Sequence, residues 1–252
     1  MSSSIWTQSG GSSRIGRLES EPYRVVEAQH RISTRKLVDS DREQAVLEQL
    51  LESGKPPLPA GASVLHYLLF TPFRYPPLPH GSRFASRWEL GIWYGSEALS
   101  TALAEVAYYR LVFLEGSAAD LEPLETELTA FTVAVATRRG VDLTRAAFAR
   151  WRGPLRSKTS YAATQPFGAA MRDAGVEAFR FLSARDDAGV NIGVFTPRAF
   201  DQPRPRGLQT WHSFATRAGV EFSKRDYFER TSYSFAREQF LVRGALPHPA
   251  IA

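Results

Sequence analysis

Cysteine is absent from this sequence of 252 residues, so disulfide bonds, thiolate zinc sites and a thiol nucleophile are excluded. No apolar run approaches the roughly eighteen residues that a membrane span needs. A glycine-rich dinucleotide fingerprint, a P-loop, an HExxH helix and a GxSxG elbow are also missing. The five histidines stand apart without ligand spacing. We therefore expect neither a bound metal nor a cofactor.

The N-terminal region lacks the apolar core of a secretory signal. Its first twenty residues are rich in Ser and Gly with scattered Arg, which predicts a disordered tail over residues 1–22. Together with the lack of cysteine, this favours a cytoplasmic protein. The composition is 43% hydrophobic and 12% aromatic, sufficient for one substantial core. We expect an extension over residues 23–60 and one main α+β domain over residues 61–249.

Acidic residues are fewer than basic ones, 26 against 31, which gives a formal charge of +5. The basic residues are spread along the chain apart from small groups such as Arg138 and Arg139. This pattern argues against a dedicated nucleic-acid surface. Arginine is far commoner than lysine, and its planar guanidinium favours bidentate contacts with anions.

The extension contains one predicted helix over residues 37–52, capped by Asp39 or Ser40 and ended by Gly54 and the Pro-rich run that follows. Several apolar residues share one face of this helix: Val46, Leu47, Leu50 and Leu51. Such a face predicts that the helix packs against the domain or against a second subunit.

The most informative stretch is GIWYGSEALSTALAEVAYYR, residues 91–110. It predicts a short strand that bears Tyr94, turns at Gly95 and Ser96, and enters a helix. Apolar side chains recur at three- and four-residue steps on one face of that helix: Leu99, Ala102, Leu103, Val106 and Phe113. Glu105 lies on the shoulder of this face, where a site could form near the end of the strand. An ordinary solvated glutamate is the alternative.

Two arginines precede that stretch. Residues 63–70 are predicted as a buried strand, which leads into a Pro-rich loop carrying Arg74 and Arg83. Four prolines stiffen this loop, and a stiff loop suits an arginine that must be held in one place. Solvated surface arginines are the alternative. After the central helix, the alternation of residues 129–137 predicts one strand.

A predicted hairpin follows later in the chain. Its strands cover residues 178–182 and 190–195, with Ser183 at the end of the first and Asn191 near the start of the second. This places a hydroxyl and an amide close together at a junction of strand and loop. Alternatively, both side chains only satisfy backbone groups of the turn.

Taken in order, these segments resemble the RES domain family, named for Arg, Glu and Ser. The pieces that carry the resemblance are FRYPP with SRF, then GIWYGSEALSTALAEV, then FRFLSARDDAGVNIGVF. The segment that begins STRKLVDSD is also similar to the extension of longer members. The resemblance extends from about residue 33 to the C-terminal FLVRGALPHPA, nearly the whole chain.

The resemblance implies a fold similar to that of ADP-ribosyltransferases, with a mixed, largely antiparallel split sheet, flanking helices and an N-terminal helical extension. It nominates Glu105, Arg74 and Ser183 as catalytic residues, with Arg83 competing with Arg74 for the role of the family's arginine. The residues that it assigns to binding of NAD are Arg74, Arg83, Tyr94, Ser183 and Asn191.

The function implied by the resemblance is that of a toxin that consumes NAD as a substrate. It would cleave the nicotinamide–ribose bond and pass ADP-ribose to phosphate or water. The first alternative is transfer of ADP-ribose to a protein, and the second is a non-catalytic basic nucleic-acid-binding module. The implied partner is a cognate Xre-like antitoxin with a helix-turn-helix, which would supply the DNA-binding half. The chain itself is expected to bind neither nucleic acid nor membrane, as a monomer or a homo-oligomer.

Overall fold

A ten-stranded sheet forms the framework of the computed structural model, which describes residues 5–28, 38–75, 77, 79–119, 121–226 and 230–249. In chain order the strands are β1 (Gly16–Ser20), β2 (Tyr23–Glu27), β3 (Trp93–Ser96), β4 (Leu124–Thr132), β5 (Val135–Asp142), β6 (Ala178–Leu182), β7 (Val190–Val194), β8 (Arg206–Thr216), β9 (Gly219–Lys224) and β10 (Ser232–Ala236). Their order in the sheet is β1-β5-β6-β7-β3-β2-β4-β8-β9-β10. β5 and β6 pair in parallel, and the other pairs are antiparallel. This confirms the α+β class with a mixed, largely antiparallel sheet.

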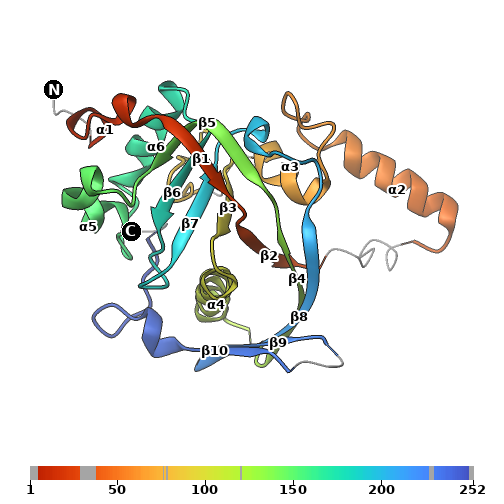
Figure 1. Cartoon of the computed structure of the whole chain (residues 1–252). Coiled ribbons are helices and arrows are strands. Elements are labelled where there is room, and N and C mark those ends of the chain that lie inside the picture. Colours follow the sequence, from red (N-terminus) through yellow and green to blue (C-terminus); the bar gives the residue numbers. More distant parts are fainter. Residues whose placement is uncertain are drawn as a thin grey trace.

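Helices lie on both sides of this sheet. The α-helices are α1 (Ile5–Gln8), α2 (Asp41–Ser53), α3 (Tyr67–Arg74), α4 (Leu99–Gly116), α5 (Arg152–Leu155) and α6 (Thr164–Asp173), and short 3₁₀ helices cover Gly11–Arg14, Ala146–Trp151, Pro197–Ala199 and Arg237–Phe240. Figure 1 shows the sheet curving around α4, which is seen almost end-on between β3 and β10. Within the described ranges, none of the helices combines the length and the apolar character needed to cross a membrane.

The pairing between β3 and β2 is very short. One register pair, Tyr23 opposite Ser96, joins these strands among the described residues, whereas β2 and β4 are joined by five such pairs. The strand order nevertheless runs through this place without interruption, and we call it the weak joint of the sheet. The joint separates two halves of the sheet, and α4 lies beside it, in contact with both β2 and β3.

The buried face of α4, which packs against the sheet, is wider than the predicted apolar face. Ala102 and Leu103 are buried as expected, but Phe113 is 52% exposed. The buried cluster around the helix instead continues through Ala107 and Leu111, which pack with side chains of β4, β8 and β9. The prediction for Phe113 was wrong because the curved sheet covers a neighbouring face of the helix. β3 also continues through Ser96, so the chain turns toward α4 later than predicted.

The predicted disorder of the N-terminal tail was wrong for residues 5–22, and residues 1–4 lie outside the described part. Trp6 is only 7% exposed, and its ring meets Phe167 edge-on at 5.9 Å. β1 follows and pairs antiparallel with β5. A composition rich in Ser and Gly concealed two anchors, Trp6 and Leu18, whose burial outweighs the cost of ordering their neighbours.

Two segments that were each predicted as a single strand have another structure. Residues 63–70 lead into α3, in which Leu69 and Phe73 lie one helical turn apart and are buried. His66 caps this helix by accepting a hydrogen bond from the backbone N–H of Leu68. The predicted strand over residues 129–137 is two strands, the end of β4 and the start of β5, separated at residues 133–134. Short apolar runs do not distinguish a buried strand from a buried helix by periodicity.

The helix of the extension, α2, begins after Ser40, whose side chain caps it as predicted. Leu37 lies outside the described residues. The predicted apolar face does not pack on the domain, because Val46, Leu50 and Leu51 are all about half exposed, at 51%, 63% and 47%. α2 projects from the body of the molecule on the side of α3 (Figure 1).

Candidate active site

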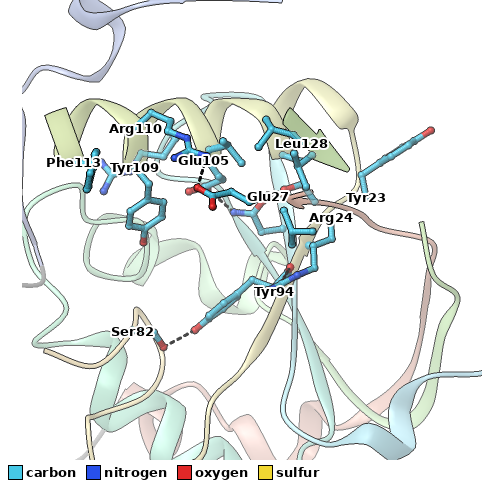
Figure 2. A pocket seen from close by; sticks show the side chains of 18 of the residues that line it. Tyr23, Arg24, Glu27, Ser82, Tyr94, Glu105, Tyr109, Arg110, Phe113 and Leu128 are labelled. Atoms are coloured by element: carbon cyan, nitrogen blue, oxygen red, sulfur yellow. Dashed lines mark hydrogen bonds and ion pairs between the residues drawn. The ribbon is translucent and has the colours of Figure 1, made fainter. Parts of the chain in front are cut away.

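A cleft of about 770 Å³ opens beside α4, at the weak joint of the sheet. β2, β3, β4 and α4 contribute most of its walls, and the lining also includes Ser82, Arg83, Tyr161 and Arg185. Its volume lies within the range of about 300–1,000 Å³ that is usual for small-molecule sites. Glu105 faces this cleft from the middle of α4, as Figure 2 shows.

The carboxylate of Glu105 is fixed at one of its two oxygens. Ser183 Oγ and Asn191 Nδ2 both donate hydrogen bonds to Glu105 Oε1, each at 2.7 Å. These are the hydrogen bonds that the described part of the chain makes with this carboxylate, so Oε2 is left to accept from a ligand. Hydrogen bonds to a charged acceptor are among the stronger ones in proteins, and two of them hold the group in one orientation.

Ser183 itself belongs to a tightly bonded loop between β6 and β7. It is fully buried, and its Oγ accepts hydrogen bonds from the backbone N–H groups of Arg185 and Asp186 at 3.0 and 3.1 Å. The loop is tied to α4 a second time, because Thr101 Oγ1 donates to Asp186 Oδ2 at 2.6 Å. Thr101 lies one turn before Glu105, so two adjacent turns of α4 are bonded to the same loop.

Arg156, the residue that follows α5, holds this loop from the other side. Its Nε donates to the carbonyl oxygen of Ser183, and its Nη2 donates to the carbonyl oxygen of Asp186 at 2.9 Å. The same guanidinium forms an ion pair with Asp187 at 2.8 Å. The position of Ser183 is therefore set by backbone contacts, not by the hydroxyl alone.

Asn191 is held from β3. Ser96 Oγ donates to Asn191 Oδ1 at 2.7 Å, and the two residues face each other in the β3–β7 register. Ser96 and Asn191 are 3% and 5% exposed. With its oxygen occupied in this way, the Asn191 amide presents its Nδ2 to Glu105.

Tyr94 lines the same cleft with its ring. Its hydroxyl lies 3.1 Å from Ser82 Oγ (Figure 2). The same hydroxyl accepts a hydrogen bond from the backbone N–H of Phe84 at 3.3 Å. Burial raises the pKa of Tyr94 to about 12, so the phenol stays neutral at physiological pH. Its ring meets Phe181 edge-on at 6.1 Å.

Four arginines line the cleft: Arg24 on β2, Arg83, Arg110 on α4 and Arg185. Arg185 is 8% exposed and stacks on the Tyr108 ring, with its central carbon 3.3 Å from the ring centroid. Among the described residues its Nη1 has no hydrogen-bond partner, and no carboxylate pairs with it. A buried cation without a counter-ion is costly, and an anionic ligand would remove that cost.

Arg24 also lacks a carboxylate partner among the described residues. Its Nη1 donates to the Tyr94 carbonyl oxygen at 2.7 Å, and its Nε has no partner in the described part of the chain. Burial lowers the pKa of Arg24 to about 10, which still leaves it charged at neutral pH. Arg83 donates to the Ser157 carbonyl oxygen at 2.8 Å and lies over the Tyr161 ring. Three positive groups thus face one cleft without a carboxylate partner among the described residues.

Comparison with known families agrees with this constellation. The model of the RES domain matches residues 58–214, more than half of the chain. The chain belongs to the RES domain family. No curated protein matches it. The RES match contains α4 and the β6–β7 loop, whereas β2, which forms one wall of the cleft, lies outside it.

The structure brings together most of the residues nominated from the RES resemblance. Glu105, Asn191, Tyr94 and Arg83 all line the cleft. Ser183 contacts Glu105 but does not line the cleft, because it is completely buried behind the carboxylate. Its contacts therefore suit positioning of Glu105 and not contact with a ligand.

Arg74 is not part of this site. It lies at the end of α3, where Nε donates to the Pro56 carbonyl oxygen at 2.6 Å and Nη1 pairs with Glu52 at 2.7 Å. The guanidinium therefore ties α2 to α3, and Arg74 is absent from the cleft lining. Because residues 67–74 form a helix and not a loop, Arg74 is directed away from the cleft. Arg83 is therefore the better candidate for the arginine of the site.

Sequence reasoning missed Arg24, Arg110 and Arg185. A weak signal existed for Arg185, because it lies two residues after Ser183 and so had to be near the same junction. Arg110 lies five residues after Glu105, just over one helical turn further along the helix. No local signal identified Arg24, which reaches the cleft only because β2 lies between β3 and β4 in the sheet.

Proposed function

We propose that this RES protein consumes NAD by cleaving the bond between nicotinamide and ribose. The observation that carries the proposal is the Glu105 carboxylate, held at Oε1 by two donors and facing a cleft lined by four arginines. Membership of the RES family supports the same assignment. The fold proposed to underlie this activity is related to that of ADP-ribosyltransferases.

The reaction develops positive charge on the sugar. As the bond from the ribose anomeric carbon to the nicotinamide nitrogen breaks, its electron pair passes to nitrogen and the ribose acquires oxocarbenium character. Glu105 Oε2 would accept a hydrogen bond from a ribose hydroxyl and face this charge, which it stabilises more in the transition state than in the ground state. Nicotinamide leaves as a neutral molecule, so no general acid is needed.

The arginines would hold the pyrophosphate. A guanidinium binds phosphate oxygens with two parallel hydrogen bonds, and Arg83, Arg185 and Arg24 carry no competing carboxylate in the described part of the chain. The Tyr94 ring would contact the nicotinamide ring, because Tyr94 lines the same cleft as Glu105 and these arginines. Asn191 would support Glu105 in the same complex.

The acceptor of ADP-ribose is phosphate or water in this proposal. Transfer to a protein target remains the first alternative, and Tyr109 and Phe113 favour it, because both line the cleft and are more than half exposed at 57% and 52%. A non-catalytic nucleic-acid-binding module has less support, because it has no use for a carboxylate held inside the cleft.

In its biological setting, we assign the protein the role of a cytoplasmic toxin. Its activity would be restrained by a cognate helix-turn-helix antitoxin that covers the cleft and carries the DNA-binding function of the pair.

The test is incubation of the purified protein with NAD, with and without inorganic phosphate, followed by mass analysis of the products. Nicotinamide with ADP-ribose phosphate would identify phosphorolysis, and nicotinamide with free ADP-ribose would identify hydrolysis. Intact NAD in both reactions, with label from NAD appearing on a protein in a cell extract, would establish the transferase instead. Intact NAD without such transfer would refute the proposal.

A further inference from the structure

The Arg110–Glu27 ion pair joins two walls of the cleft. Arg110 on α4 and Glu27 at the end of β2 both line it, and Arg110 Nη2 lies 2.6 Å from Glu27 Oε1. The Arg110 side chain is 14% exposed, whereas that of Glu27 is 61% exposed. Figure 2 shows the pair beside the Glu105 carboxylate, with the Arg110 and Glu27 side chains reaching toward each other.

This pair sets Arg110 apart from the other arginines of the cleft. Arg24, Arg83 and Arg185 have no carboxylate partner among the described residues, so each can take an anion without losing an ion pair. Arg110 is already neutralised, and its partner Glu27 is the more solvent-exposed member of the pair. Glu27 thus occupies the position on the Arg110 guanidinium that an oxyanion would otherwise take.

We propose that Glu27 acts as an internal competitor for the anionic group of the ligand. Arg110 exchanges the Glu27 carboxylate for a phosphate oxygen when the ligand binds, and Glu27 turns into solvent. In NAD this group would be one of the two phosphates, and that identification rests on the function proposed above. The competition itself concerns any phosphate ligand of the cleft.

The energetics make this exchange accessible. An ion pair with one largely exposed member contributes little, since solvent screens it and both side chains lose freedom in forming it. A guanidinium can hold a phosphate by two parallel charge-assisted hydrogen bonds, whereas Glu27 meets Arg110 through one oxygen. Removing the competitor should therefore tighten binding of a phosphate ligand by about two- to fivefold. Removing a residue that contacts the ligand would instead weaken the binding.

The experiment measures binding of inorganic pyrophosphate to the full chain by calorimetry, for the wild type and for Glu27→Gln, Arg110→Gln and the double variant. Glu115→Gln serves as the matched control, because Glu115 pairs with Arg237 at the same 2.6 Å but outside the cleft. It removes one negative charge from the same helix that carries Arg110. Turnover of NAD by the wild type is measured separately, so that failure of the proposed function is seen independently.

The proposal predicts tighter pyrophosphate binding by Glu27→Gln, weaker binding by Arg110→Gln and no change in Glu115→Gln. In the Arg110→Gln background the Glu27→Gln change should have no further effect, because the two residues act through one contact. Unchanged or weaker binding by Glu27→Gln would overturn the proposal. So would equal tightening in the Glu115→Gln control or in the Arg110→Gln background, since either result would reflect net charge alone.

Discussion

Replacement of Ser183 by alanine tests whether this residue positions Glu105 or contacts the substrate. The change removes one of the two hydrogen bonds to Glu105 Oε1 and leaves the one from Asn191. A hydrogen bond to a charged group contributes about 1.5–3 kcal/mol. If that bond serves the transition state, kcat should fall by about ten- to a hundredfold. Because Ser183 does not line the cleft, KM for NAD should be unchanged.

The same substitution should also destabilise the protein. Ser183 Oγ accepts hydrogen bonds from the backbone N–H groups of Arg185 and Asp186, and alanine leaves the buried Arg185 N–H and the partly buried Asp186 N–H without this acceptor. An unsatisfied buried donor costs about 1–3 kcal/mol, so the free energy of unfolding should fall by at least that amount.

Urea unfolding measures this stability, and steady-state assays of nicotinamide release separate kcat from KM. Ser213→Ala is the control, because Ser213 is 2% exposed and its hydroxyl has no partner among the described residues. It should be close to neutral in both assays. An increase in KM for Ser183→Ala with kcat preserved would refute the positioning role and place the hydroxyl against the substrate.

Three further predictions follow from the fold and the site. Arg83→Ala should raise KM for NAD by tenfold or more, whereas Arg74→Ala should leave it unchanged, because only Arg83 lines the cleft; steady-state kinetics of both variants decide this. Trp6→Ala should lower the free energy of unfolding by about 3–5 kcal/mol, and an effect below about 0.5 kcal/mol in urea unfolding would mean that the N-terminal segment is not packed. The stability contributed by Tyr94, whose folded pKa is raised to about 12, is complete below its unfolded pKa of about 10 and is lost as pH rises from there through 12. In the Tyr94→Phe variant, the melting temperature should therefore fall less steeply between pH of about 10 and about 12 than in the wild type.

Much of the site could be predicted where the relevant residues lie close in sequence. The hairpin of β6 and β7 has nearly the predicted bounds, and it brings Ser183 and Asn191 to one junction. The apolar periodicity of residues 99–116 placed Glu105 on a helix at the edge of a packed face. These are local patterns, and local patterns are what sequence periodicity reports.

What the sequence could not predict depends on distant contacts. The bond between Thr101 and Asp186 joins residues 85 apart, and the bond between Arg156 and Ser183 joins residues 27 apart. Arg74 and Arg83 could be distinguished only once residues 67–74 were known to form a helix. Trp6 is a single aromatic residue in a segment of Ser and Gly, and its burial requires the Phe167 side chain far along the chain.

The central claim is that Glu105 drives cleavage of NAD, and release of nicotinamide by the wild type and by Glu105→Gln tests it most directly. Glutamine keeps an oxygen that can accept from Ser183 and Asn191 but lacks the charge, so the fold should be preserved. The account predicts that the wild type releases nicotinamide and that the variant, with an unchanged unfolding transition, does so at least a hundredfold more slowly. Equal rates in the two proteins would contradict it.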